Sequence, residues 1–165
     1  MEGLSALDLR TTKVSGEPWD FMEAGDRAEA RRMVQEDKPD WLIGSPPCTA
    51  FSLWQQLNFS KMTEEKVKRN LAEGRLHLRF MVSLDYEQIK GGRHVLHEHP
   101  QGAASWKEPC MAALLAHPRV DSVVARQCRI GKTSPEKTWN TQLVTKPTRF
   151  ASTSPGAAET GEDLY

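Results

Sequence analysis

Apolar residues occur along the chain either in short continuous runs or at helical intervals. Four short runs predict strands over 6–9, 40–44, 93–98 and 120–125. Three stretches with apolar residues spaced to share one face predict helices over 27–36, 63–89 and 107–116. Strands that alternate with helices are typical of a parallel sheet covered by helices, so the pattern predicts an α/β fold.

Polar residues and glycines set the predicted ends of the helices. Asp26 and Glu29 have the spacing of a capping box at the start of the first helix. Gly91 ends the long helix, and Gly74 weakens its middle. Beyond Phe150 the residues are small and acidic and show no periodicity, which predicts a single domain over 1–150 and a disordered tail over 151–165.

The charge balance excludes a strong overall field. Lysine plus arginine and aspartate plus glutamate both number 22 in 165 residues, so any contact with a polyanion must be local. One basic stretch is a candidate for phosphate contact: Lys61, Lys66, Lys68, Arg69, Arg75 and Arg79. No signal peptide and no apolar run long enough to span a membrane is found, so we expect an intracellular protein, nuclear or cytoplasmic.

Two residues with reactive side chains follow predicted strands. Cys48 comes after the 40–44 strand on a loop stiffened by Pro46 and Pro47, and Glu98 ends the next strand. The carboxyl ends of parallel strands meet at one edge of a sheet. We therefore predict that the thiol and the carboxyl project into one pocket. The three cysteines, Cys48, Cys110 and Cys128, form no CxxC pair, which indicates free thiols.

The loop from Gly44 to Ser52, Gly-Ser-Pro-Pro-Cys-Thr-Ala-Phe-Ser, resembles the proline-cysteine loop of the DNA cytosine-5 methyltransferases, Gly-x-Pro-Pro-Cys-Gln-x-Phe-Ser. Glu98 matches the glutamate of that family's Glu-Asn-Val strand end. The resemblance implies a Rossmann-like methyltransferase fold, with DNA as partner and S-adenosylmethionine as cofactor. No metal is implied.

The resemblance also implies a mechanism and a cofactor site. The thiolate of Cys48 would add to C6 of a flipped-out cytosine while Glu98 assists at N3, and C5 would take the methyl group. The residues implied for the cofactor are Asp8 at the ribose, Asp20 and Phe21 at the adenosine, and Pro46 in the loop.

The chain departs from the family pattern in several places. The Phe-x-Gly-x-Gly loop and the strand before it are lacking, Thr49 replaces the glutamine, and His99 replaces the asparagine. The residues after Phe150 leave no room for a target-recognition domain. We therefore expect a truncated or degenerate member, inactive alone, whose missing strand comes from another chain or a polyprotein segment.

Two other functions stay open. The first is a non-catalytic remnant of a mobile element, because Ser-Pro-Pro-Cys and Glu-His-Pro modules are similar to segments of retroelement polyproteins. The second is a cysteine hydrolase that uses Cys48, Glu98 and either His97 or His99. Zinc ligation by His94, His97 and His99, expected on one strand face, lacks a fourth ligand and is not predicted.

Overall fold

The computed structural model describes residues 7, 11–13, 15–126 and 147–154. Its contacts divide the chain into two compact units, residues 1–39 and residues 40–165. Most of the strand predicted over 6–9, including Asp8, lies outside the described residues.

The first unit contains a loop and one helix. Helix α1, Ala24–Asp37, confirms the helix predicted over 27–36. The predicted capping box is wrong, because the helix begins after Glu23, whose side chain makes no capping bond. Asp26 is buried in the first turn and instead accepts hydrogen bonds from the backbone N–H of Asp20, at 2.7 Å, and from Nζ of Lys13, at 2.8 Å. It therefore fixes the preceding loop.

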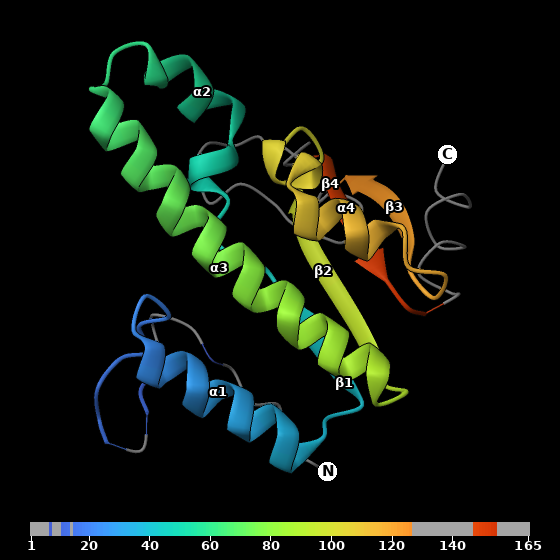
Figure 1. Ribbon diagram of the computed structural model, residues 1–165. Helices are drawn as coiled ribbons and strands as arrows, with labels where there is room; N and C mark the ends of the chain where they lie inside the picture. Colours follow the sequence, from blue (N-terminus) through green and yellow to red (C-terminus); the bar gives the residue numbers. More distant parts are fainter. Residues whose placement is uncertain (1–6, 8–10, 14, 127–146, 155–165) are drawn as a thin grey trace, which may run out of the picture. The chain divides into compact units, whose positions relative to one another are not determined.

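The second unit is built on a four-stranded sheet with the order β1-β2-β4-β3 (Figure 1). Its strands are β1 Trp41–Gly44, β2 His94–Pro100, β3 Asp121–Arg126 and β4 Pro147–Ser152. Strands β1 and β2 are parallel, whereas β4 is antiparallel to both β2 and β3. The three predicted strands therefore run in one direction, and the sheet is mixed because β4, which was not predicted, runs in the opposite direction.

Strand β4 was not expected, and the domain end predicted at residue 150 falls inside it. Its last residues, Ala151 and Ser152, are buried. Ser152 donates a hydrogen bond to the carbonyl of Val95, and the hydroxyl of Thr153 accepts the Val95 N–H. Small polar residues can occupy the sheet here because β2 satisfies their hydroxyl groups.

Helical segments fill the connections between strands. They are η1 Thr49–Phe51, α2 Leu53–Phe59, α3 Glu64–Lys90, η2 Ala104–Lys107 and α4 Pro109–Leu115. Helices α3 and α4 confirm the predictions over 63–89 and 107–116, whereas α2 is new. Thr63 caps α3 by accepting the N–H of Lys66, as a threonine at that position does.

Helices α3 and α4 pack against one face of the sheet (Figure 1). The buried core joins Leu78 and Val82 of α3 and Met111 of α4 to Val95 and Ala151 of the sheet. On the opposite face, Trp41 is 45% exposed and Ile43 is 65% exposed. The second unit is thus an α/β structure whose helices cover the sheet face opposite Trp41 and Ile43.

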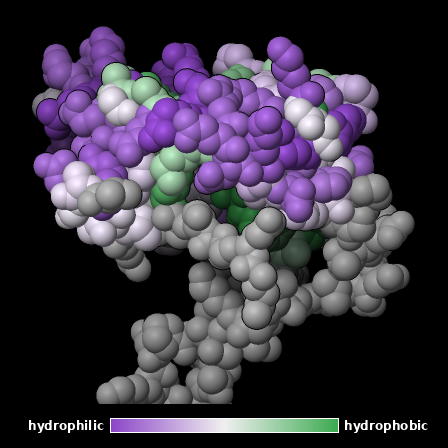
Figure 2. Space-filling model, turned by 90° about the horizontal axis from the view of Figure 1, so that it is seen from below, coloured by the Kyte–Doolittle hydropathy of each residue, from purple (hydrophilic) through white to green (hydrophobic). Residues whose placement is uncertain are grey.

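The described surface is largely hydrophilic in the view of Figure 2, where a smaller hydrophobic area lies among charged and polar residues. None of the described helices is both long enough and apolar enough to cross a bilayer.

Candidate functional site

The proline-cysteine loop leaves β1 beside the end of β2. In the parallel pair formed by these strands, Gly44 lies opposite His97. The next loop residues, from Ser45 onward, therefore run alongside Glu98 and His99. The sheet places two segments separated by about fifty residues at one edge, as expected for neighbouring parallel strands.

Ser45 joins the loop directly to Glu98. The Ser45 hydroxyl donates to Oε2 of Glu98 across 2.5 Å. A bond of this length is typical of a hydroxyl that donates to a carboxylate. No role was predicted for Ser45 from the sequence, although its position at a strand end beside two prolines was a signal.

His99 holds the same loop from the other side. Its Nε2 lies 2.8 Å from the carbonyl oxygen of Pro46, and its Nδ1 lies 2.6 Å from Oγ of Ser105. A carbonyl only accepts hydrogen bonds, so Nε2 carries the proton. In the neutral ring, Nδ1 then accepts from the Ser105 hydroxyl. From the sequence, His99 was noted as a departure from the family pattern and as one of two histidines for the hydrolase alternative, whereas no role was predicted for Ser105.

Two glycines allow the loop to lie close to α3. A Cβ atom on Gly44 would come within 2.5 Å of the side chain of Met81. A Cβ atom on Gly74, in the middle of α3, would come within 2.7 Å of Cβ of Ala50 and 3.1 Å of the Phe51 ring. The lack of a side chain at Gly74 thus leaves room for Ala50 and Phe51, which follow Cys48, and Phe51 is buried against the helix.

Cys48 is a half-buried free thiol at the start of η1. Its carbonyl accepts the N–H of Phe51 at 3.0 Å, which fixes the backbone around it. The described hydrogen bonds join Glu98 to Ser45, three residues before Cys48. The structure therefore brings together the loop that carries the thiol and the strand end that carries the carboxyl.

His97 belongs to a separate buried pair. Its Nδ1 lies 2.9 Å from Oδ2 of Asp85 on α3, and both side chains are fully buried. Burial raises the pKa of Asp85 above its ordinary value, although the hydrogen bond and charge of His97 act in the opposite direction. Among the described residues, Nε2 of His97 and Oδ1 of Asp85 have no hydrogen-bond partner. A hydrolase triad that used His97 would require this arrangement to change.

The three histidines of β2 do not share a face. His97 and His99 are buried toward the helices, whereas His94 is half-buried on the opposite face and stacks on Trp41 with ring centroids 4.8 Å apart. The expectation that all three lie on one face is wrong because strand side chains alternate and 94 and 97 differ by an odd number. Within the described residues, no group of three or more His, Cys, Asp or Glu side chains could hold a metal ion.

The residues predicted for the cofactor lie in different parts of the chain. Asp8 is outside the described residues, Asp20 and Phe21 belong to the first unit, and Pro46 belongs to the second. Asp20 is exposed, and its Oδ1 accepts the N–H of Met22 at 2.8 Å. Such a contact is typical of a turn residue.

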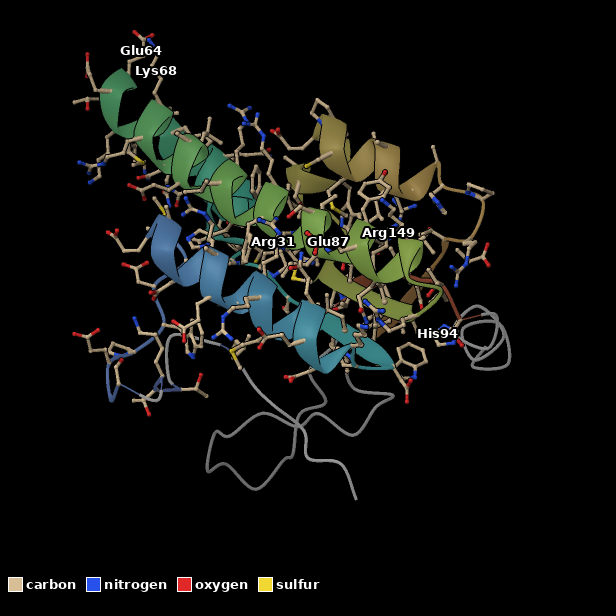
Figure 3. The ribbon with its side chains drawn as sticks, turned by 60° about the horizontal axis from the view of Figure 1, so that its bottom comes forward. Arg31, Glu64, Lys68, Glu87, His94 and Arg149 are labelled. Atoms are coloured by element: carbon tan, nitrogen blue, oxygen red, sulfur yellow. The ribbon has the colours of Figure 1, made fainter. Side chains whose placement is uncertain are left out.

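The basic stretch predicted for phosphate contact is partly neutralised by its neighbours. Lys68 pairs with Glu64 at 2.6 Å near the start of α3, where Figure 3 shows the two side chains together. Arg69 lies 3.9 Å from Glu73. Arg75 makes a two-pronged bond to Glu108 at 3.0 Å, which ties α3 to α4. These pairs reduce the positive charge that would attract a phosphate.

Comparisons with known proteins add no relative to this description. No protein-family model matches the chain, and neither the curated proteins nor the solved structures contain a significant match.

Proposed function

We propose that the second unit is a cytosine-5 methyltransferase-like domain of Rossmann type, in which Cys48 and Glu98 activate a cytosine. One observation carries the proposal: the 2.5 Å hydrogen bond between Ser45 and Glu98. It ties the loop that resembles the family's nucleophile loop to the glutamate that resembles the family's acid.

The proposed chemistry uses one nucleophile and one acid. The thiolate of Cys48 forms a bond to C6 of the cytosine, and the π electrons of the C5–C6 bond shift toward N3. Glu98 donates a proton to N3 and so prevents negative charge from building up on the ring. Carbon 5 becomes nucleophilic and accepts an electrophile. Loss of the C5 proton to water then expels Cys48 as the thiolate, N3 returns its proton to Glu98, and the aromatic ring is restored. Ser45 can serve both states of Glu98, because a hydroxyl donates to a carboxylate and accepts from a carboxylic acid.

S-adenosylmethionine, when bound, supplies an electrophilic methyl group. The resemblance introduces it, and the methyl group is needed only after C5 has become nucleophilic. The base-activating steps above therefore involve only Cys48, Glu98 and Ser45.

Exchange of the cytosine C5 hydrogen tests the proposal without any methyl donor. Addition of Cys48 at C6 followed by protonation at C5 and elimination releases tritium from DNA labelled at C5. The chain is expected to be inactive alone in methyl transfer, but label release needs only base activation. We therefore expect the wild-type chain to release the label, Cys48→Ser to release none, and Glu98→Gln to release it at least tenfold more slowly. Cys110→Ser, at another half-buried free thiol, is the matched control and should match wild type. Release that persists in Cys48→Ser would refute the assignment.

A non-catalytic remnant is the second candidate, and the lack of the Gly-rich Phe-x-Gly-x-Gly loop in the sequence favours it. Calorimetric titration of the chain with S-adenosylmethionine separates the two. The methyltransferase reading expects saturable binding that weakens in Phe21→Ala. Absence of binding at millimolar cofactor together with absence of label release would favour the remnant.

A further inference from the structure

We propose that His99 is a positioning residue of this site, which holds the carbonyl of Pro46 and thereby controls how the loop presents the Cys48 thiol. The catalytic consequence rests on the proposed function, whereas the effect on the thiol does not. His99 stands where the resembled family has asparagine, and no role was predicted for it beyond the hydrolase alternative.

Consecutive residues of the strand hold consecutive residues of the loop. Glu98 bonds the side chain of Ser45, and His99 bonds the main chain of Pro46. Side chains 98 and 99 point to opposite faces of the sheet, because strand side chains alternate. The loop is thus held by two side chains that lie on opposite faces of β2. Loss of either bond would leave the loop attached to β2 on one face only.

The ring of His99 is itself immobilised. It is 1% exposed, and the Pro46 carbonyl, which only accepts, fixes its tautomer with the proton on Nε2. The Ser105 hydroxyl, 2.6 Å from Nδ1, then donates to that nitrogen and orients the ring. The Trp106 ring lies edge-on to it, with centroids 6.1 Å apart. The Nε2–H donor of His99 is therefore buried and fixed in direction, and it holds the Pro46 carbonyl in one orientation. Such an arrangement is what positioning of a nucleophile requires.

Loss of the His99 bond should let the loop open locally. Cys48 lies two residues after Pro46 and is half-buried, so opening would expose its thiol. Cys110 is also half-buried, but it lies on α4 and packs against the core. The two cysteines therefore separate a local change in the loop from a general loosening of the fold.

The test measures alkylation of each cysteine by iodoacetamide in the native full chain, resolved by peptide mass spectrometry. In His99→Phe, which keeps a ring but removes the donor, we expect Cys48 to react about three- to tenfold faster and Cys110 to react at the wild-type rate. His99→Gln, whose amide can place a donor near the position of Nε2, should restore a rate within about twofold of wild type. His94→Phe is the matched control, because His94 lies on the other face of β2.

Ser105→Ala serves as a milder variant, which also decides the question if His99→Phe does not fold. It should raise the Cys48 rate about two- to threefold, because Nδ1 of His99 loses the hydroxyl that orients the ring toward the Pro46 carbonyl. An unchanged or lower Cys48 rate in these variants, or an equal increase at Cys110, would overturn the proposal. The alkylation result is independent of label release, so failure of the positioning role and failure of the methyltransferase role are distinguishable.

Discussion

The hydroxyl of Ser45 donates to Glu98 across 2.5 Å, although the two residues are 53 positions apart in the sequence. The bond exists because β1 and β2 are parallel neighbours, whose carboxyl ends meet at one edge of the sheet. It connects two segments whose sequences each suggested a function. Its removal should therefore affect activity more than stability.

Substitution Ser45→Ala tests this relationship. We expect the rate of label release from C5-tritiated DNA to fall about threefold or more, because Glu98 loses the group that orients it. The free energy of unfolding should fall by less than about 1 kcal/mol, since the bond is exposed to solvent. Ser60→Ala is the control, because the exposed Ser60 hydroxyl donates back to the carbonyl of Leu57, one turn earlier in the same segment. Equal rates in Ser45→Ala and wild type would contradict the role of Ser45.

Gly74→Ala should destabilise the second unit even though alanine favours helices. A Cβ atom at 74 would meet Cβ of Ala50 at 2.7 Å, so the segment after Cys48 must move. We expect a loss of about 1–3 kcal/mol in the free energy of unfolding, measured by urea denaturation. It should be accompanied by faster alkylation of Cys48.

Gly25→Ala provides the contrast for the same exchange. Gly25 lies in the first turn of α1, and a Cβ atom there would meet nothing within 4 Å. Alanine should therefore increase protection of the α1 amides from hydrogen exchange, by about threefold or more. Stabilisation by Gly74→Ala would show that local helix preference rather than close packing decides. Destabilisation by Gly25→Ala would contradict the open space at that position.

Asp85 should make stability fall as the pH rises. Burial raises its pKa in the folded chain above the ordinary value of 3.8, so between these two values the folded state binds more protons than the unfolded state. The free energy of unfolding then decreases with rising pH across that window. In Asp85→Asn, which cannot titrate, urea denaturation at a series of pH values should give a flatter profile. Asp121→Asn, at an exposed aspartate, should keep the wild-type slope.

Asp26 should have the opposite effect in the first unit. The Asp20 N–H, and then Lys13, lower its pKa below 3.8, so its contribution is present above 3.8 and is lost as the pH falls through the lowered value. The Asp20 amide should therefore lose protection from hydrogen exchange, relative to its intrinsic rate, in acid. In Asp26→Asn that protection should be low at every pH. Glu17→Gln is the control. Glu17 is exposed, its carboxylate lies 3.6 Å from Nζ of Lys13, and the Asp20 N–H bonds Asp26 instead, so this variant should behave like wild type.

Local patterns predicted several elements correctly. The apolar run at Leu42-Ile43 became β1, and the helical spacing after Thr63 became α3, which begins and ends within one residue of the prediction. Both signals depend on side chains near one another in the sequence, so a pattern of period two or 3.6 reveals them. Strand β4 gave no such signal, because its small and polar residues are suited to the sheet only through bonds to β2.

The sequence alone determined that a cysteine follows a strand on a loop stiffened by prolines, and that a glutamate ends the next strand. Only the tertiary structure decided that Ser45 bonds Glu98, that His99 bonds Pro46, and that Gly74 receives the segment after Cys48. It also decided that an antiparallel strand lies between β2 and β3. The physical reason is the range of the interactions: periodicity reports neighbours along the chain, whereas these contacts join residues from about 25 to more than 50 positions apart.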